Sequence, residues 1–133
     1  MEAFTVRTSR GNDWMAFGRR GAVLEFEQAK RTVDADFALV RANAGGKVER
    51  FGWAGGRLLT SDGRILATAD APVHSLSVLL DGDRLIVDAP EPESTLSVRA
   101  EGAKSFVLNG VEITRPAVRD GMYLPFADQP RAL

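Results

Sequence analysis

The sequence contains no cysteine. This absence excludes a disulfide framework, a thiolate nucleophile and any zinc site that uses cysteine ligands. The sequence has one histidine, His74, so a histidine pair at metal-ligand spacing is also missing, and we predict no metal site and no cofactor. A single histidine acts as a base only beside a positioned partner, and we interpret His74 as an ordinary strand residue.

The sequence also lacks an excess of charge of either sign, with 17 basic and 18 acidic residues. Nucleic-acid-binding domains normally carry a basic stripe, whereas the pairs Arg19-Arg20 and Lys30-Arg31 are isolated here. We therefore expect no nucleic-acid partner. An anionic polysaccharide stays open as a partner, because folding could still assemble a local basic patch.

Long hydrophobic runs are missing as well. The longest apolar stretches have the length of a strand, which argues against a membrane-spanning helix, and we expect no membrane partner. The segment Met1 to Phe4 has neither the basic start nor the apolar core of a signal peptide. If the protein is exported, we expect its signal to lie upstream of this sequence.

The sequence does contain a succession of short alternating segments separated by turn residues, most clearly from Val73 to Ile113. Asp81-Gly82 separates one pair of segments, and Asn109-Gly110 separates another. These dipeptides adopt positive φ at low cost and are the strongest local signal for a β-hairpin. Turn signals recur about every ten residues, as in sandwiches and barrels. We predict an all-β protein, an antiparallel two-sheet β-sandwich of jelly-roll-like type.

Two N-terminal segments need separate interpretation. Leu24–Arg31 contains good helix formers, but no N-cap residue precedes it and its apolar residues alternate around Phe26, so we predict a strand that runs into a loop. The segment Gly18–Gly21 has a glycine at each end. We predict that it is the loop of a hairpin between the strands Trp14–Phe17 and Ala22–Phe26.

The length of 133 residues leaves room for one domain, and an apolar share of 44% is enough for one packed core. We predict a single β-sandwich domain over residues 1–133, with an ordered core at about 3–126 and a frayed tail at 127–133. Strands before Trp53 are richer in aromatic residues than those after it. This change predicts that the two parts of the chain form the two sheets.

Three aromatic residues are the candidate ligand-binding residues: Trp14, Trp53 and Tyr123. A tryptophan on a sandwich surface can stack on a sugar ring, so all three could serve a carbohydrate-binding module. We favour core packing for both tryptophans, because each lies in an alternating apolar segment, with Phe51 two residues before Trp53 on the same face. We expect the Tyr123 ring to pack on the core and its hydroxyl to lie at the rim.

No catalytic residue is predicted. Asp62, Asp81 and Asp120 each precede a glycine, which turn chemistry explains without catalysis or calcium. No serine lies in a nucleophile-elbow context, and no glycine run resembles a phosphate loop. A pair of carboxylates from distant parts of the chain could still meet in the folded protein.

Several of these patterns together resemble the C-terminal β-sandwich of heparinase II/III-like polysaccharide lyases. The resemblance extends from about Trp14 to Phe126. It depends on the segments Asp34–Val40, Gly45–Val48, Arg57–Leu59, Asp62–Arg64, Leu80–Asp83, Leu85–Val87 and Phe106–Gly110.

In that family an α/α toroid precedes the sandwich and supplies most of the catalytic apparatus for β-elimination of uronic-acid polymers. The family's sandwich can add a histidine and metal ligands, but His74 does not lie in a copy of that motif, so no catalytic residue is carried over. The resemblance implies a non-catalytic accessory domain that packs against a catalytic toroid and helps form the polysaccharide cleft. It also implies a periplasmic or secreted protein.

Two alternatives to this function stay open. One is an independent carbohydrate-binding module that uses exposed aromatic residues, and the other is a structural or protein-interaction sandwich unrelated to sugars. A large exposed apolar patch would favour packing against another domain. An exposed line of aromatic side chains would favour sugar binding.

Overall fold

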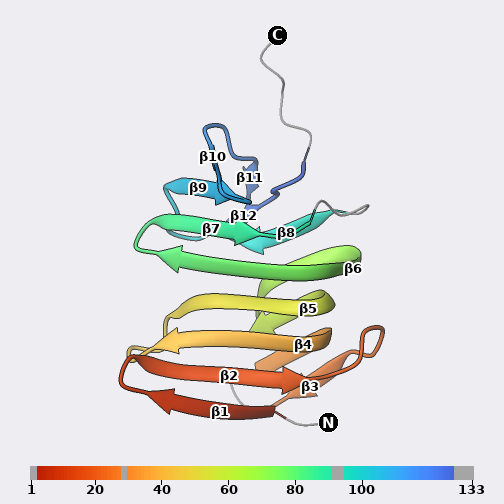
Figure 1. Cartoon of the computed structure of the whole chain (residues 1–133). Helices are drawn as coiled ribbons and strands as arrows, with labels where there is room; N and C mark the ends of the chain where they lie inside the picture. Colours follow the sequence, from red (N-terminus) through yellow and green to blue (C-terminus); the bar gives the residue numbers. More distant parts are fainter. Residues whose placement is uncertain (1–2, 28–29, 91–94, 128–133) are drawn as a thin grey trace.

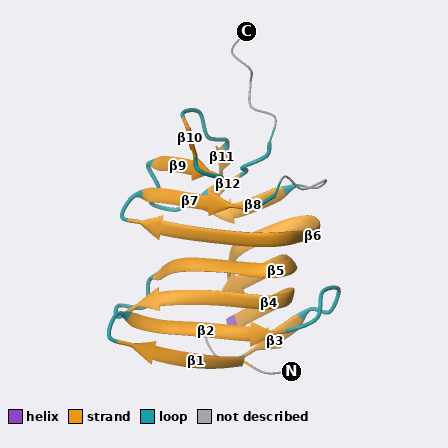
Figure 2. Ribbon diagram, in the orientation of Figure 1, coloured by secondary structure: helices purple, strands orange, loops and turns teal. Residues whose placement is uncertain are grey.

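The computed structural model describes residues 3–27, 30–90 and 95–127. Within these ranges the chain forms β-strands and no α-helix, which confirms the predicted all-β class (Figure 2). The strands are β1 (Ala3–Thr8), β2 (Gly11–Phe17), β3 (Leu24–Phe26), β4 (Arg31–Asn43), β5 (Val48–Ser61), β6 (Arg64–Asp81), β7 (Arg84–Asp88), β8 (Leu96–Arg99), β9 (Ser105–Leu108), β10 (Val111–Ile113), β11 (Val118–Arg119) and β12 (Met122–Tyr123).

The strands form one mostly antiparallel sheet that folds over into two layers, so the predicted β-sandwich is confirmed (Figure 1). The first layer has the order β1-β2-β4-β5-β6-β7-β9-β10. In the second layer β3, β4, β5, β6, β8, β12 and β11 pair in that order. Among the described strands, β7 and β9 are the one parallel pair. From β1 to β7, neighbouring strands of the first layer follow one another in the chain, except that β3 is left out.

The predicted division of the two sheets at Trp53 is wrong. The long strands β4, β5 and β6 belong to both layers, because each curves from one into the other (Figure 1). On β4 and β5, Asp34 pairs with Leu58 and Ala35 pairs with Gly56, which leaves Arg57 as an extra residue in a β-bulge. A bulge bends its strand and strengthens the local twist, so the layers are joined where the register shifts.

The predicted hairpin across Gly18–Gly21 is also wrong. β2 and β3 do not pair with each other; β2 pairs with the second half of β4 and β3 pairs with the first half. The glycine-bounded loop carries the chain between the layers, and two carboxylates of β4 hold it there. Asp36 accepts hydrogen bonds from the Arg20 guanidinium at 2.8 and 3.1 Å, and Asp34 accepts one from the backbone N–H of Gly21 at 2.7 Å.

Both predicted hairpins form, and one of their two turns lies on the dipeptide that indicated it. Asn109 and Gly110 have φ values of 49° and 80°, and Leu108 pairs with Val111, as a type I′ turn requires. In the other hairpin Asp81 pairs with Arg84, so the two turn residues are Gly82 and Asp83 rather than Asp81 and Gly82. Gly82, with φ of 64°, supplies the positive φ that a type II′ turn needs at its first position.

One continuous hydrophobic core fills the space between the layers. A row of inward side chains crosses the first layer by direct pairing: Trp14, Val40, Phe51, Val78 and Val87. Leu24–Phe26 is a strand, as predicted. Of the predicted frayed tail at 127–133, residues 128–133 lie outside the described residues, and the backbone N–H of Ala127 donates to the carbonyl of Leu124.

Candidate functional site

The three aromatic residues predicted as candidate ligands are all buried, with exposed fractions of 1% for Trp14, 4% for Trp53 and 1% for Tyr123. The Trp53 indole N–H donates to the carbonyl oxygen of Val73 at 3.1 Å. Trp14 packs edge-on against Phe26, and the Arg31 guanidinium lies 4.8 Å from its ring centre. The predicted core positions of both tryptophans are confirmed. Because these rings are enclosed, none offers a free face on which a sugar could stack.

Tyr123 departs from the prediction in one respect. Its ring packs on Phe106 with the ring centres 4.9 Å apart, but its hydroxyl is buried and has no hydrogen-bond partner within the described residues. The ring enters the space between the layers because β12 extends the second layer and its Tyr123 pairs with Val98. Burial raises the pKa of the phenol above its ordinary value. The hydroxyl therefore lies in the core and not at the rim.

His74 is an exposed residue of β6, as its interpretation as a strand residue implies. In the parts of the chain that the structure describes, no group of three or more His, Asp or Glu side chains could hold a metal ion. Nor does any described helix have the length and apolar character needed to cross a membrane.

The outer surface of the first layer carries an apolar cluster that was not predicted from the sequence. Phe4, Met15, Phe17, Phe37 and Leu39 share this surface, and we call them the aromatic face. The ring centre of Phe17 lies 6.0 Å from that of Phe4 and 5.1 Å from that of Phe37. Phe4 and Phe17 are 42% and 50% exposed. This cluster lies on the face opposite the inward side chains Trp14 and Val40, so β2 and β4 are apolar on both of their faces.

A signal for the aromatic face was present in the sequence. Segments β2 and β4 have apolar residues at consecutive positions as well as alternate ones, at Trp14-Met-Ala-Phe17 and Phe37-Ala-Leu-Val40. Such a segment is apolar on both faces, which is typical of a strand covered on both sides. Only one of those sides is covered within the described residues.

A shallow groove of 210 Å³ adjoins the aromatic face, next to Phe37 and Leu39. The groove crosses Gly52, where a Cβ atom would lie 2.1 Å from the carbonyl oxygen of Leu76 on β6. Only glycine fits this close approach of two strands, and the lack of a side chain keeps the groove open. The outer surface thus combines projecting rings with an adjoining hollow.

An ion pair borders the aromatic face. The Arg41 guanidinium donates two hydrogen bonds to the Asp13 carboxylate, at 2.7 and 3.0 Å. These bonds hold the pKa of Asp13 below its ordinary value and the pKa of Arg41 above its ordinary value. The two groups stay charged together near neutral pH, so they add polarity to this border without adding net charge.

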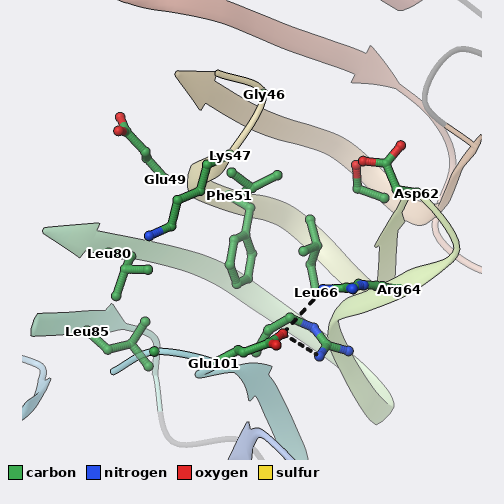
Figure 3. A pocket seen from close by; sticks show the side chains of 14 residues that line it. Gly46, Lys47, Glu49, Phe51, Asp62, Arg64, Leu66, Leu80, Leu85 and Glu101 are labelled. Atoms are coloured by element: carbon green, nitrogen blue, oxygen red, sulfur yellow. Dashed lines mark hydrogen bonds and ion pairs between the residues drawn. The ribbon is translucent and has the colours of Figure 1, made fainter. Parts of the chain in front are cut away.

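A second hollow opens between the two layers, at the end of the sandwich where β4 turns into β5 and β5 turns into β6. Its volume is 670 Å³, and we call it the end cleft (Figure 3). Apolar side chains from both layers form its floor, namely Phe51, Leu80 and Leu85 of the first layer and Leu66 of the second.

Charged residues surround the end cleft. On the second-layer side, Glu101 accepts from Arg64 at 3.3 Å and lies 3.7 Å from Arg99. The Arg99 Nε also donates to the carbonyl oxygen of Ile65 at 2.7 Å, which fixes its guanidinium. On the first-layer side stand Lys47 and Glu49, and the Glu49 carboxylate accepts from the Asn43 amide at 3.2 Å. The arrangement can bind a molecule with an apolar body and a charged end.

Comparison with known proteins adds no assignment to these surfaces. Neither a protein-family model nor a curated protein matches the sequence.

Proposed function

We propose that this chain is a non-catalytic accessory β-sandwich of a polysaccharide lyase-like protein, and that it packs against a catalytic toroid through its aromatic face. In this position it would help form one wall of the polysaccharide cleft. The exposure of Phe4 and Phe17 beside Phe37, on the outer surface of a well-packed sandwich, is the observation that carries the proposal. Exposed apolar clusters on otherwise polar surfaces mark sites of contact with other proteins.

The arrangement of the rings supports packing rather than sugar binding. Phe4 is tilted by 31° to Phe17, and Phe17 is tilted by 54° to Phe37, so the three rings do not form a flat platform. Phenylalanine also has no polar atom with which to hydrogen-bond a sugar hydroxyl. The adjoining groove at Gly52 would accept a side chain from a partner domain.

Two experiments test the two parts of this proposal. First, the purified chain should show no eliminase activity on alginate, heparan sulfate or hyaluronan, measured by the absorbance of the unsaturated uronide product. A sustained signal that His74→Ala abolishes would overturn the non-catalytic assignment.

Second, a purified α/α-toroid domain of a heparinase II/III-like lyase from the same organism should bind the chain in titration calorimetry. Phe17→Asp places a charge in the centre of the aromatic face and should weaken this binding at least about tenfold, because central apolar residues dominate interfaces. Val111→Asp is the matched control, since Val111 is 62% exposed but lies on β10, at the opposite edge of the layer. Equal effects of the two variants, or no binding of the toroid, would contradict the docking role.

A further inference from the structure

The floor of the end cleft is made of side chains that cannot hydrogen-bond. Phe51, Leu66, Leu80 and Leu85 supply its apolar surface, with Leu80 only half-buried. A sugar placed over this floor would lose water from its hydroxyls without gaining partners, which is unfavourable. A hydrocarbon chain placed there would bind favourably, because its contact with water is unfavourable and is removed. The floor therefore favours an aliphatic occupant.

The charged groups that turn toward the floor are mainly positive. In Figure 3 the Lys47 side chain extends toward Leu80, whereas the carboxylates of Glu49 and Asp62 point away from Phe51. The Lys47 ammonium has no ion-pair partner within the described residues. An anionic end group on an apolar ligand would complement this charge.

The opposite rim also carries cations, beside the carboxylates of Asp62 and Glu101. There two guanidinium groups, of Arg64 and Arg99, share the single carboxylate of Glu101. The volume of 670 Å³ lies within the range of about 300–1,000 Å³ that is usual for small-molecule sites. Cationic side chains thus stand on both sides of a hollow that is large enough for a small ligand.

We propose that the end cleft binds an aliphatic carboxylate of the size of a medium-chain fatty acid. The hydrocarbon chain lies on Phe51, Leu66, Leu80 and Leu85, and the carboxylate lies at the mouth, beside Lys47. This site lies between the layers at one end of the sandwich, whereas the aromatic face is on the outer surface. The inference goes beyond the proposed docking function and does not depend on it.

The test is an NMR titration of the ¹⁵N-labelled chain with decanoate, kept below its critical micelle concentration. We expect saturable shifts of backbone signals from residues that line the end cleft, such as Lys47 and Leu80. Titrations with octanoate and dodecanoate, which are shorter and longer than decanoate by two methylene groups, measure how much the apolar floor contributes to the affinity. Each added methylene should tighten binding by up to about fourfold, as the burial of a CH₂ group implies.

The charge of the ligand is tested separately. Decanol has the same number of carbon atoms, with a neutral CH2OH end in place of the carboxylate, and should bind more weakly than decanoate. Lys47→Ala should weaken decanoate binding by about two- to fivefold, the usual size of an exposed ionic contact, and should leave decanol binding unchanged. Lys104→Ala is the matched control, because Lys104 is exposed and does not line the cleft, and it should change neither affinity.

Four results would overturn the proposal. The first is the absence of saturable shifts, and the second is a set of shifts confined to the aromatic face. The third is equal binding of decanoate and decanol in the unaltered chain, or equal effects of the two lysine variants. The fourth is tighter binding of an alginate trisaccharide than of decanoate at the end cleft, which would assign the cleft to uronic-acid sugars.

Discussion

Asp34 and Arg57 form an ion pair across the bend that joins the two layers, with the Arg57 Nε 2.7 Å from an oxygen of the Asp34 carboxylate. The Asp34 side chain is only 1% exposed, whereas that of Arg57 is 44% exposed. Arg57 is the extra residue of the β5 bulge, and bulges often redirect a side chain in this way. The other oxygen of Asp34 accepts from Gly21, so one buried carboxylate ties β4, β5 and the crossing loop together.

Replacing Arg57 should therefore destabilise the fold more than replacing an arginine of an exposed pair. Arg57→Met leaves a buried carboxylate with one hydrogen bond, and we expect a loss of about 1–3 kcal/mol in the free energy of unfolding. Arg20→Met removes the guanidinium from the exposed carboxylate of Asp36 and should cost clearly less, because solvent screens this pair. Urea unfolding measures both losses. Similar losses would show that the buried pair does not hold the bend.

The two tryptophans should respond differently to the change to phenylalanine. Trp53→Phe leaves the buried carbonyl of Val73 without its partner, whereas the indole N–H of Trp14 has none to lose within the described residues. We expect Trp53→Phe to cost about 1–2 kcal/mol more than Trp14→Phe, beyond the similar loss of volume. Denaturant midpoints give the comparison, and a larger loss for Trp14 would contradict it.

Fluorescence tests the burial of the same two residues. Both indoles lie in the core, so the emission of the folded chain should be blue-shifted and acrylamide should quench it poorly. Addition of soluble oligosaccharide should not change the quenching. Efficient quenching that an oligosaccharide suppresses would instead support the carbohydrate-binding alternative.

The Asn109-Gly110 turn should be sensitive to any side chain at its second position. Gly110 has φ of 80°, and a Cβ there would have no atom within 4 Å, so the effect of substitution is purely conformational. We expect Gly110→Ala to cost about 1–2 kcal/mol. Gly45→Ala is the control, because Gly45 is exposed and is not among the glycines with positive φ. An unchanged urea midpoint for Gly110→Ala would be inconsistent with a type I′ turn.

Stability should depend on pH through the Asp13–Arg41 pair. Hydrogen bonds from Arg41 lower the pKa of Asp13 in the folded chain. The pair therefore stabilises the fold above the unfolded-state pKa of about 3.9, and this contribution is lost as the pH falls through the lower folded-state value. Asp13→Asn should lower the free energy of unfolding by about 0.5–1 kcal/mol at pH 6. It should change it by almost nothing once the pH is below the folded-state pKa of Asp13. A difference that stays constant with pH would contradict this linkage.

A control separates this effect from a general response to acid. Asp88 is exposed and forms no ion pair within the described residues, so Asp88→Asn should cost less stability than Asp13→Asn at pH 6. Added salt should also reduce the effect of Asp13→Asn, because the Arg41 side chain is 44% exposed and is screened by ions.

The sequence by itself determined the all-β class and the turn at Asn109-Gly110. Asn109-Gly110 folds the chain back because these two residues accept positive φ, a local property that needs no tertiary contact. The alternation that includes Phe51 and Trp53 likewise identified two core residues, because side chains two apart lie on one face of a strand.

Only the tertiary structure decided which strands meet and which faces are covered. Alternation shows that a strand has two faces, but a face is buried only if another layer covers it, so the exposure of Phe17 on β2, beside the half-buried Phe37 of β4, could not be predicted. The bulge at Arg57, which bends β5 into both layers, depends on pairing between strands. The end cleft joins Lys47 to Arg99, which lie far apart in the sequence, because strand order brings their turns to the same end of the sandwich.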